Sequence, residues 1–151
     1  MKLYSIKKYY ADGAPRIAYT TNKDGNRHGT YQHWYPNGQL RTQEEWINGN
    51  RHGTCQFWYT NGQIWEQCEY VNGVPQGIRY FWAFNGSLAY IQQYDNGELL
   101  VEVDYISDNG RARKVVLIEV YDGVNIESTG FIANATTKLN EEGRTFKIKQ
   151  K

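Results

Sequence analysis

The sequence has almost no net charge and no long hydrophobic run, and each absence excludes a class of protein. It contains 17 basic and 16 acidic residues among 151, which gives a formal net charge of +1. That balance offers no electrostatic reason to expect a nucleic-acid partner, and charge does not support membrane attachment. No apolar run is long enough to span a bilayer, and residues 1–8 do not lead into the hydrophobic core of a signal peptide. We therefore expect a cytoplasmic protein.

The sequence also lacks the short motifs of common enzyme classes. It contains no nucleophile elbow, phosphate-binding loop, HExxH motif or CxxC pair. We therefore expect a non-catalytic protein that needs no cofactor and no metal ion. An enzyme with its site between the fourth hairpin and the C-terminal tail is the less favoured alternative.

Glycine and aromatic residues are abundant, with 15 Gly, 5 Trp, 13 Tyr and 5 Phe. Most of the glycines fall into a 24-residue repeat whose consecutive units begin at Gly29, Gly53 and Gly77. Each unit has a Trp in one fixed column and two Asn-Gly pairs in two others. The tryptophan column is Trp34, Trp58 and Trp82, and the first Asn-Gly pair lies three residues after each of them.

One repeat unit has the pattern of a β-hairpin. An Asn-Gly pair between aromatic segments is typical of a tight type I′ turn, so we expect strands over 30–35 and 39–46 joined at Asn37-Gly38. The second pair, Asn48-Gly49, is expected to open a longer turn. The predicted fold is all-β, a sheet of tandem antiparallel hairpins. The units lie near 5–28, 29–52, 53–76 and 77–100.

A two-residue turn at Asn61-Gly62 would place Cys55 directly opposite Cys68, and would pair Phe57 with Glu66 and Tyr59 with Ile64. A cross-strand disulfide is conceivable at that register. Two reduced thiols in a cytosolic protein are the interpretation that we favour.

The repeated pattern G-x-x-x-x-W-Y-x-N-G followed by a second N-G resembles the MORN repeat. It is most similar to the variant found in bacterial and phage proteins, some of which are described as YwqK-like antitoxins. The resemblance covers residues 5–100 well and 101–123 poorly. It implies an elongated sheet of hairpins that serves as an interaction or membrane-attachment module.

Residues 101–151 do not follow the sequence pattern of the repeats. We expect strands over 114–121, 126–132 and 146–149, a turn at 122–123 and a short helical segment over 136–142. A repeat array needs its open end covered, so this region is interpreted as a degenerate repeat followed by a small β-rich C-terminal cap. Alternatively, it carries the specific function.

The tryptophan column is the first candidate site, and Trp65 is expected to join it opposite Trp58. If the column is covered, it is core; if exposed, it is an aromatic strip that binds proteins, sugars or cations. The loops Arg27-His28 and Arg51-His52 are the second candidate, as small anion sites. The third repeat lacks both charges there, so a copied turn is the favoured interpretation.

Two other sets of polar residues are expected to be structural. His33 shares a column with Phe57 and Phe81, which indicates a packing role. Four carboxylates on the second hairpin strands are expected on a solvated face rather than in an acid pair: Glu44, Glu45, Glu66 and Glu69.

The sequence therefore predicts a binding protein, in its most specific form an antitoxin-like inhibitor that blocks a partner protein through its extended face. The alternative is a small-ligand or phospholipid-headgroup binder. The candidate partner-binding residues are Trp34, Trp58, Trp65, Trp82, Arg27, His28, Arg51 and His52.

Overall fold

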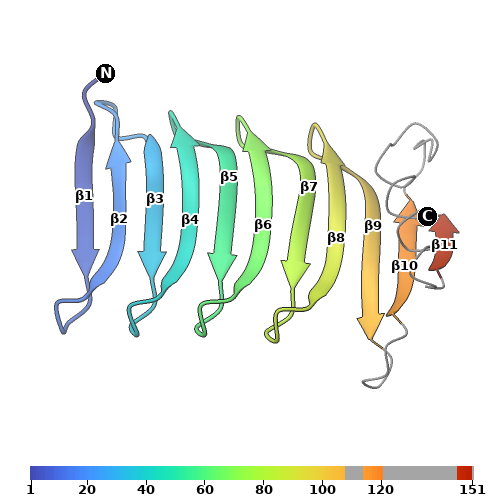
Figure 1. Cartoon of the computed structure of the whole chain (residues 1–151). Coiled ribbons are helices and arrows are strands. Elements are labelled where there is room, and N and C mark those ends of the chain that lie inside the picture. Colours follow the sequence, from blue (N-terminus) through green and yellow to red (C-terminus); the bar gives the residue numbers. More distant parts are fainter. Residues whose placement is uncertain (108–113, 121–145, 151) are drawn as a thin grey trace.

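The computed structural model describes residues 1–107, 114–120 and 146–150 and places their strands in one sheet (Figure 1). The 11 strands lie side by side in chain order. Neighbours are antiparallel except β10 and β11, which are parallel. No helix occurs in the described ranges, and the predicted all-β sheet of sequential hairpins is confirmed. The strands are β1 (Tyr4–Tyr9), β2 (Pro15–Thr21), β3 (Gly29–Trp34), β4 (Leu40–Ile47), β5 (Asn50–Trp58), β6 (Ile64–Val71), β7 (Val74–Trp82), β8 (Leu88–Asp95), β9 (Glu98–Ser107), β10 (Lys114–Val120) and β11 (Phe146–Gln150).

The hairpin register is the predicted one away from the turn and differs beside it. Cys55 pairs with Cys68, as expected, but Trp58 and not Tyr59 pairs with Ile64. The predicted two-residue turn at Asn61-Gly62 is therefore wrong. The chain makes a three-residue loop in which the Gly62 amide donates to the Tyr59 carbonyl at 3.0 Å, and a β-bulge beside Trp58 absorbs the extra residue.

The asparagine side chain explains why this loop is wider than predicted. The Oδ1 atom of Asn61 accepts a hydrogen bond from the amide of Gln63 at 3.0 Å. That local bond holds Asn61 outside the left-handed region, so only Gly62 takes a positive φ, of 83°. A type I′ turn needs positive φ at both central residues.

The second Asn-Gly pair of each unit makes the tight turn instead. Asn72 and Gly73 have φ of 52° and 84°, and the flanking residues Val71 and Val74 pair directly. The expectation of a longer turn at this pair is therefore wrong. The glycine amide also reaches back to the preceding unit, since the N–H of Gly73 donates to the Arg51 carbonyl at 2.8 Å.

Tyrosine hydroxyls join successive repeats at the other end of the hairpins. Tyr35 donates to the Trp58 carbonyl at 2.8 Å, and Tyr59 donates to the Trp82 carbonyl at 2.9 Å. Each bond spans 23 residues, so the repeat period itself brings donor and acceptor together. These bonds fix each unit against the next one only, as expected for a repeat array.

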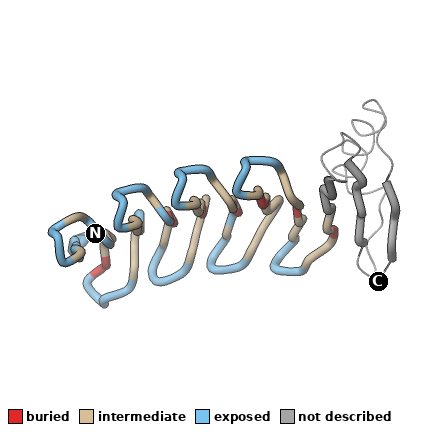
Figure 2. Tube along the Cα trace, turned by 90° about the horizontal axis from the view of Figure 1, so that it is seen from below, coloured by how far each residue is buried: buried red, intermediate tan, exposed pale blue. Residues whose placement is uncertain are grey.

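The described part of the sheet is a single layer, and few of its side chains are buried. The buried hydrophobic residues are Cys55, Cys68, Phe81, Ile91 and Val101. Figure 2 shows buried positions as short segments within the strands, separated by long exposed turns. Cross-strand pairs therefore stabilise the sheet, and no second layer of the described chain covers either face.

The C-terminal strands continue the same sheet. The predicted strand over 114–121 corresponds to β10, which pairs with β9, and the predicted strand over 146–149 corresponds to β11. The expected strand over 126–132, turn at 122–123 and helical segment over 136–142 lie outside the described residues. The division of the chain at residue 100 stays a prediction.

Candidate functional site

The two faces of the sheet carry different side chains, because directly paired residues project to the same side. We call the face with Arg27, Arg51 and Arg79 the arginine face. We call the face with Trp34, Trp58 and Trp82 the tryptophan face.

On the tryptophan face, each tryptophan of the column lies opposite an aliphatic residue. Trp34 pairs with Leu40 and Trp58 with Ile64, and Trp82 repeats the arrangement with Leu88. The three tryptophans are half-buried. The tryptophan column is thus neither fully buried nor fully exposed.

Glutamines form a second row on the tryptophan face. Gln32 donates to Gln43 at 2.9 Å, and Gln56 donates to Gln67 at 3.0 Å. These amides pair with each other across each hairpin, whereas the Oε1 atom of Gln93 on the same face is buried without a hydrogen-bond partner among the described residues.

Trp65 does not join the tryptophan column, and that expectation is wrong. It is the extra residue of the bulge opposite Phe57 and Trp58. Its ring centroid lies 5.5 Å from that of Phe57 and 6.4 Å from that of Phe81. Both partners belong to the arginine face, because Glu66 pairs with each of them. The bulge therefore turns the Trp65 ring to the opposite side of the sheet.

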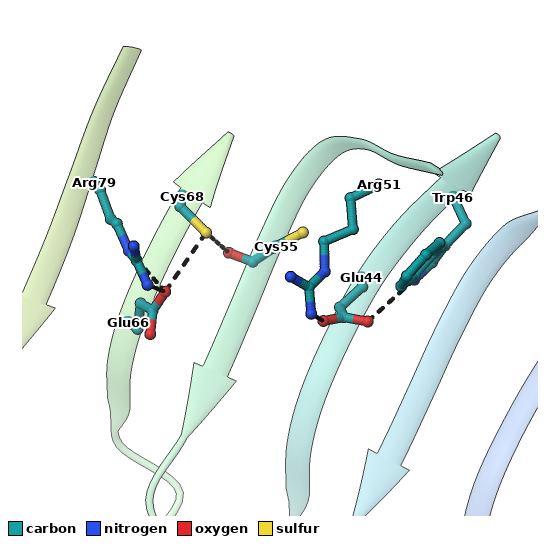
Figure 3. A network of polar contacts seen from close by, with 7 residues as sticks. All are labelled: Glu44, Trp46, Arg51, Cys55, Glu66, Cys68 and Arg79. Atoms are coloured by element: carbon teal, nitrogen blue, oxygen red, sulfur yellow. Dashed lines mark hydrogen bonds and ion pairs between the residues drawn. The ribbon is translucent and has the colours of Figure 1, made fainter. Parts of the chain in front are cut away.

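The arginine face contains two buried carboxylates, each paired with an arginine from the next strand (Figure 3). The Arg51 Nη2 atom lies 2.8 Å from the Glu44 carboxylate, whose other oxygen accepts the Trp46 indole N–H at 3.0 Å. The guanidinium of Arg79 donates through Nε and Nη2 to one oxygen of Glu66, at 2.9 and 2.6 Å.

These contacts correct the prediction for two of the four carboxylates. Glu44 and Glu66 are only 3% and 4% exposed, so they do not lie on a solvated face. Glu45 and Glu69 project from the tryptophan face, where they accept hydrogen bonds from Thr30 and Thr54 at 2.8 and 2.6 Å. Strand parity could have separated the pairs, because the correct Cys55–Cys68 register already places Glu66 beside the cysteines.

The pairing also governs the charge on the arginines. Burial lowers the pKa of Arg51, but Glu44, Tyr70 and Cys55 together outweigh it and leave the pKa raised. Burial and Glu66 oppose one another in the same way at Arg79, whose pKa is also raised. Both side chains are therefore committed to internal ion pairs.

The two cysteines are buried and free between these ion pairs. The Cys68 thiol donates to the Cys55 carbonyl at 3.8 Å and lies 3.7 Å from the Glu66 carboxylate. Contact with Cys55, burial and the charge of Glu66 all raise the pKa of Cys68. A buried thiol with a raised pKa is a poor nucleophile.

The histidines of the Arg-His loops support turns. The Nδ1 atoms of His28 and His52 accept the amides of Asn48 and Asn72 at 3.4 Å, and in the next unit the Gln76 side chain accepts the amide of Asn96 at 2.8 Å. One column thus has one role in three repeats, which agrees with the copied-turn interpretation. Use of these loops as anion sites stays a prediction.

Arg27 and Arg51 are stacked among aromatic rings. Arg51 lies between Trp46 and Tyr70, at 5.5 and 5.4 Å from their ring centroids. Arg27 lies 4.6 Å from the Tyr31 ring and 4.8 Å from the Trp46 ring. The repeat columns identify these arginines but not the aromatic rings that they contact.

His33 lies on the arginine face, where it pairs with Thr42. Burial lowers its pKa, and the charges of Arg41 and Arg16 lower it further. Its position in the column of Phe57 and Phe81 fits a neutral imidazole packed as an aromatic ring.

Within the described residues, no three histidine, cysteine or acidic side chains gather where they could hold a metal ion. Nor does that part of the chain contain a helix long and apolar enough to cross a membrane.

Comparison with known proteins gives a family match and several distant structural likenesses. The MORN repeat variant family matches residues 27–48 and 51–72, which span the hairpins around both ion-paired carboxylates. No curated protein matches the chain.

The solved structures that resemble the chain are much longer than it. A crystal structure of TarM is 12% identical with a TM-score of 0.33, covering 77% of this chain and 19% of that one. An S. aureus TarM mutant in complex with fondaparinux, alpha-GlcNAc-glycerol and UDP is 11% identical with a TM-score of 0.31, covering 70% and 18%. The chain thus spans less than a fifth of either structure.

MORN repeats are generally binding modules, are typically non-catalytic and commonly mediate contacts between proteins. The matched segments form the hairpins β3 to β6, with Glu44 and Arg51 on the strands on either side of the junction between them. Residues 27–48 and 51–72 of this chain match the MORN repeat variant family.

Proposed function

We propose that this chain is a non-catalytic module that binds a partner protein on its arginine face. The observation that carries the proposal is the composition of that face. Tyrosine, tryptophan and arginine are the residues that most often dominate binding energy at protein interfaces. Here six of them lie together without a second layer of the described chain above them: Tyr19, Tyr31, Trp46, Tyr70, Arg27 and Arg51. Trp65 lies on the same face, against Phe57 and Phe81.

The ordering of this face also supports binding. Arg51 and Arg79 are fixed by buried carboxylates, and their guanidinium groups lie against aromatic rings. Side chains that are already ordered lose little conformational entropy when a partner docks. The antitoxin-like inhibitor expected from the resemblance is a narrower form of this proposal, in which the bound partner is an enzyme. A cytoplasmic location belongs to the same proposal and agrees with two unpaired cysteines.

Affinity purification from the native cells tests the proposal. The chain should recover one protein at a fixed stoichiometric ratio. Charge reversal at exposed Arg41, which neighbours His33 on the arginine face, should reduce recovery at least fivefold. Charge reversal at exposed Glu69 on the tryptophan face is the matched control and should not. Failure to recover any stoichiometric partner contradicts the proposal, and so does equal sensitivity to both reversals.

A second candidate function has one observation in its favour. A pocket of about 270 Å³ opens at the N-terminal end of the sheet, and Trp34 and two lysines line it. The lining residues are Lys7, Lys8, Tyr9, Pro15, Ile17, Ala18, Gln32 and Trp34. An aromatic wall beside cationic side chains suits a small anionic ligand such as a phosphorylated headgroup.

Tryptophan fluorescence discriminates this candidate. Phospholipid vesicles and anionic saccharides should change the emission of the wild-type chain, and the change should disappear in Trp34→Phe but persist in Trp82→Phe. No spectral change with either class of compound excludes this use of the pocket.

A further inference from the structure

Arg27 and Arg51 occupy the same column of the repeat, but no carboxylate of the described chain compensates the charge of Arg27. Arg51 and Arg79, which lie on the same face, have carboxylates at 2.8 and 2.6 Å. Arg27 makes neither an ion pair nor a side-chain hydrogen bond with any residue that the structure describes. Its recorded side-chain contacts are with three rings, those of Tyr19 at 5.4 Å, Tyr31 at 4.6 Å and Trp46 at 4.8 Å.

The repeat shows what is missing at this position. Arg51 occupies the same column 24 residues later, and Glu44 compensates its charge from the strand before it. Glu44 pairs with Cys55, which is 24 residues after Tyr31. The register of β2 and β3, in which Ala18 pairs with Gln32, continues to Tyr19 opposite Tyr31. Tyr19 therefore stands where the next repeat has Glu44.

A guanidinium among three rings still has five N–H donors to satisfy. Aromatic faces attract the charge but accept these hydrogen bonds only weakly, whereas a carboxylate accepts two in the fork geometry. In the next repeat, Arg51 has rings at 5.5 and 5.4 Å and a carboxylate at 2.8 Å, although its Nε atom is buried without a hydrogen-bond partner among the described residues.

The charge distribution favours an acidic group at this end of the molecule. Residues 1–28 contain six basic and two acidic side chains, a formal charge of +4. Residues 29–107 contain three basic and eight acidic side chains, a formal charge of −5. An acidic segment of a partner is thus attracted toward the strands around Arg27 and repelled by the net negative charge of residues 29–107.

We infer that Arg27 is a docking point for a carboxylate side chain of the partner protein, which completes the arrangement that Glu44 completes for Arg51. This inference rests on the proposed function, since it names the chemistry by which the arginine face recognises its partner. A single partly exposed ion pair is weak, so it sets the orientation of the partner within a larger contact area.

The test uses the arginine side-chain N–H signals in an NMR titration of the full chain with a glutamate-rich peptide. The Arg27 Nε–H signal should shift saturably in the millimolar range, while those of Arg51 and Arg79 stay in place. Inorganic phosphate at equal ionic strength is the comparison. No shift of Arg27, an equal shift of all three arginines, or tighter binding of phosphate than of peptide overturns the inference.

The repeat supplies a variant that closes the site. Tyr19→Glu places a carboxylate beside Arg27, as Glu44 lies beside Arg51 in the following unit. The shift of the Arg27 signal with peptide should therefore fall at least tenfold. Tyr19→Phe is the control and should retain it. The indole N–H signal of Trp46 reports whether the local structure is kept in both variants. A Tyr19→Glu chain that still responds like wild type contradicts the inference.

Binding measurements with the purified partner distinguish this inference from the proposed function. Arg27→Gln should weaken its binding at least tenfold, and Lys23→Gln, an equal change of charge at an exposed loop position, should weaken it less than twofold. If both have the same effect, the partner does not use Arg27 although the proposed function stands. If no partner is recovered but the peptide titration succeeds, the proposed function fails while the carboxylate site remains.

Discussion

At the scale of single residues, a buried carboxylate is the most constrained group in this sheet. Glu44 and Glu66 are among the least exposed side chains of the described chain, although no second layer covers them. Large neighbours on the same face exclude water, so each carboxylate depends on its arginine for compensation. Removal of one member of such a pair leaves the other without its partner.

Glu66→Gln should therefore destabilise the protein by about 1–3 kcal/mol, because the Arg79 guanidinium loses its charged acceptor. Glu69→Gln, on the exposed side of the same strand, should cost less than about 0.5 kcal/mol. Urea unfolding followed by tryptophan fluorescence measures both. Equal losses would show that Glu66 is not a structural ion-pair partner.

His33 makes stability depend on pH. Its folded-state pKa lies below the ordinary value of 6.5, first because of burial and then because of Arg41 and Arg16. The unfolded chain therefore binds the proton more readily, and stability falls as pH drops through 6.5 toward the folded-state pKa. His33→Phe, which matches Phe57 and Phe81 of its column, should weaken this dependence.

Unfolding midpoints in urea at about pH 7.5 and pH 5.5 measure that difference. The wild-type midpoint should fall more than that of the His33→Phe variant between these two values. Identical changes in the two proteins would mean that His33 titrates normally in the folded state.

At the scale of the element, the hairpin is defined by two kinds of turn with the same Asn-Gly sequence. The side chain of Asn61 bonds the amide two residues ahead and forms a wide loop, whereas Asn72 enters the left-handed region at φ 52°. The dipeptide alone does not distinguish them. The residue that follows differs, since Gln63 precedes a bulge and Val74 begins a strand directly.

The tight turn requires a positive φ at Asn72, and substitutions there test this requirement. Asn72→Val should destabilise the protein by about 1–2 kcal/mol, because a β-branched residue is strained at positive φ. Asn72→Gly should be tolerated within about 0.5 kcal/mol, because glycine adopts that conformation freely. Thermal unfolding of both variants checks the difference, and a tolerated valine would contradict the assigned turn.

The sequence predicted the hairpins well, but not which side chains lie on which face of the sheet. Period, strand positions and the Cys55–Cys68 register followed from repeated columns, which are local and counted along the chain. The position of Trp65 could not be counted, because one bulged residue reverses the side to which a side chain projects. The burial of Glu44 and Glu66 depends on arginines from other strands, which no single repeat unit reveals.

At the scale of the whole molecule, the described sheet behaves as a one-dimensional array. Each strand pairs with its sequence neighbours, and the tyrosine bonds reach only the next repeat. Stability should therefore be close to a sum of unit and neighbour contributions. Such an array presents a continuous face along the described strands.

Deletion of residues 53–76 tests this additivity, because it removes one 24-residue period and joins His52 to Gly77 in register. The shortened chain should keep its β-sheet circular dichroism spectrum and unfold cooperatively. Its urea m-value should fall by roughly one sixth, in proportion to the surface removed. Loss of folded structure would show that the repeats depend on long-range contacts.

The central claim is that the arginine face, and not the tryptophan face, contacts the partner protein. Photo-crosslinking in the native cells tests it, with p-benzoylphenylalanine placed in turn at three tyrosine positions. Tyr31 and Tyr70 lie on the arginine face, and Tyr80 lies on the tryptophan face, stacked on Trp82. Our account predicts one crosslinked protein from positions 31 and 70 and none from position 80. Crosslinks from position 80 alone, or from none of the three positions, would contradict it.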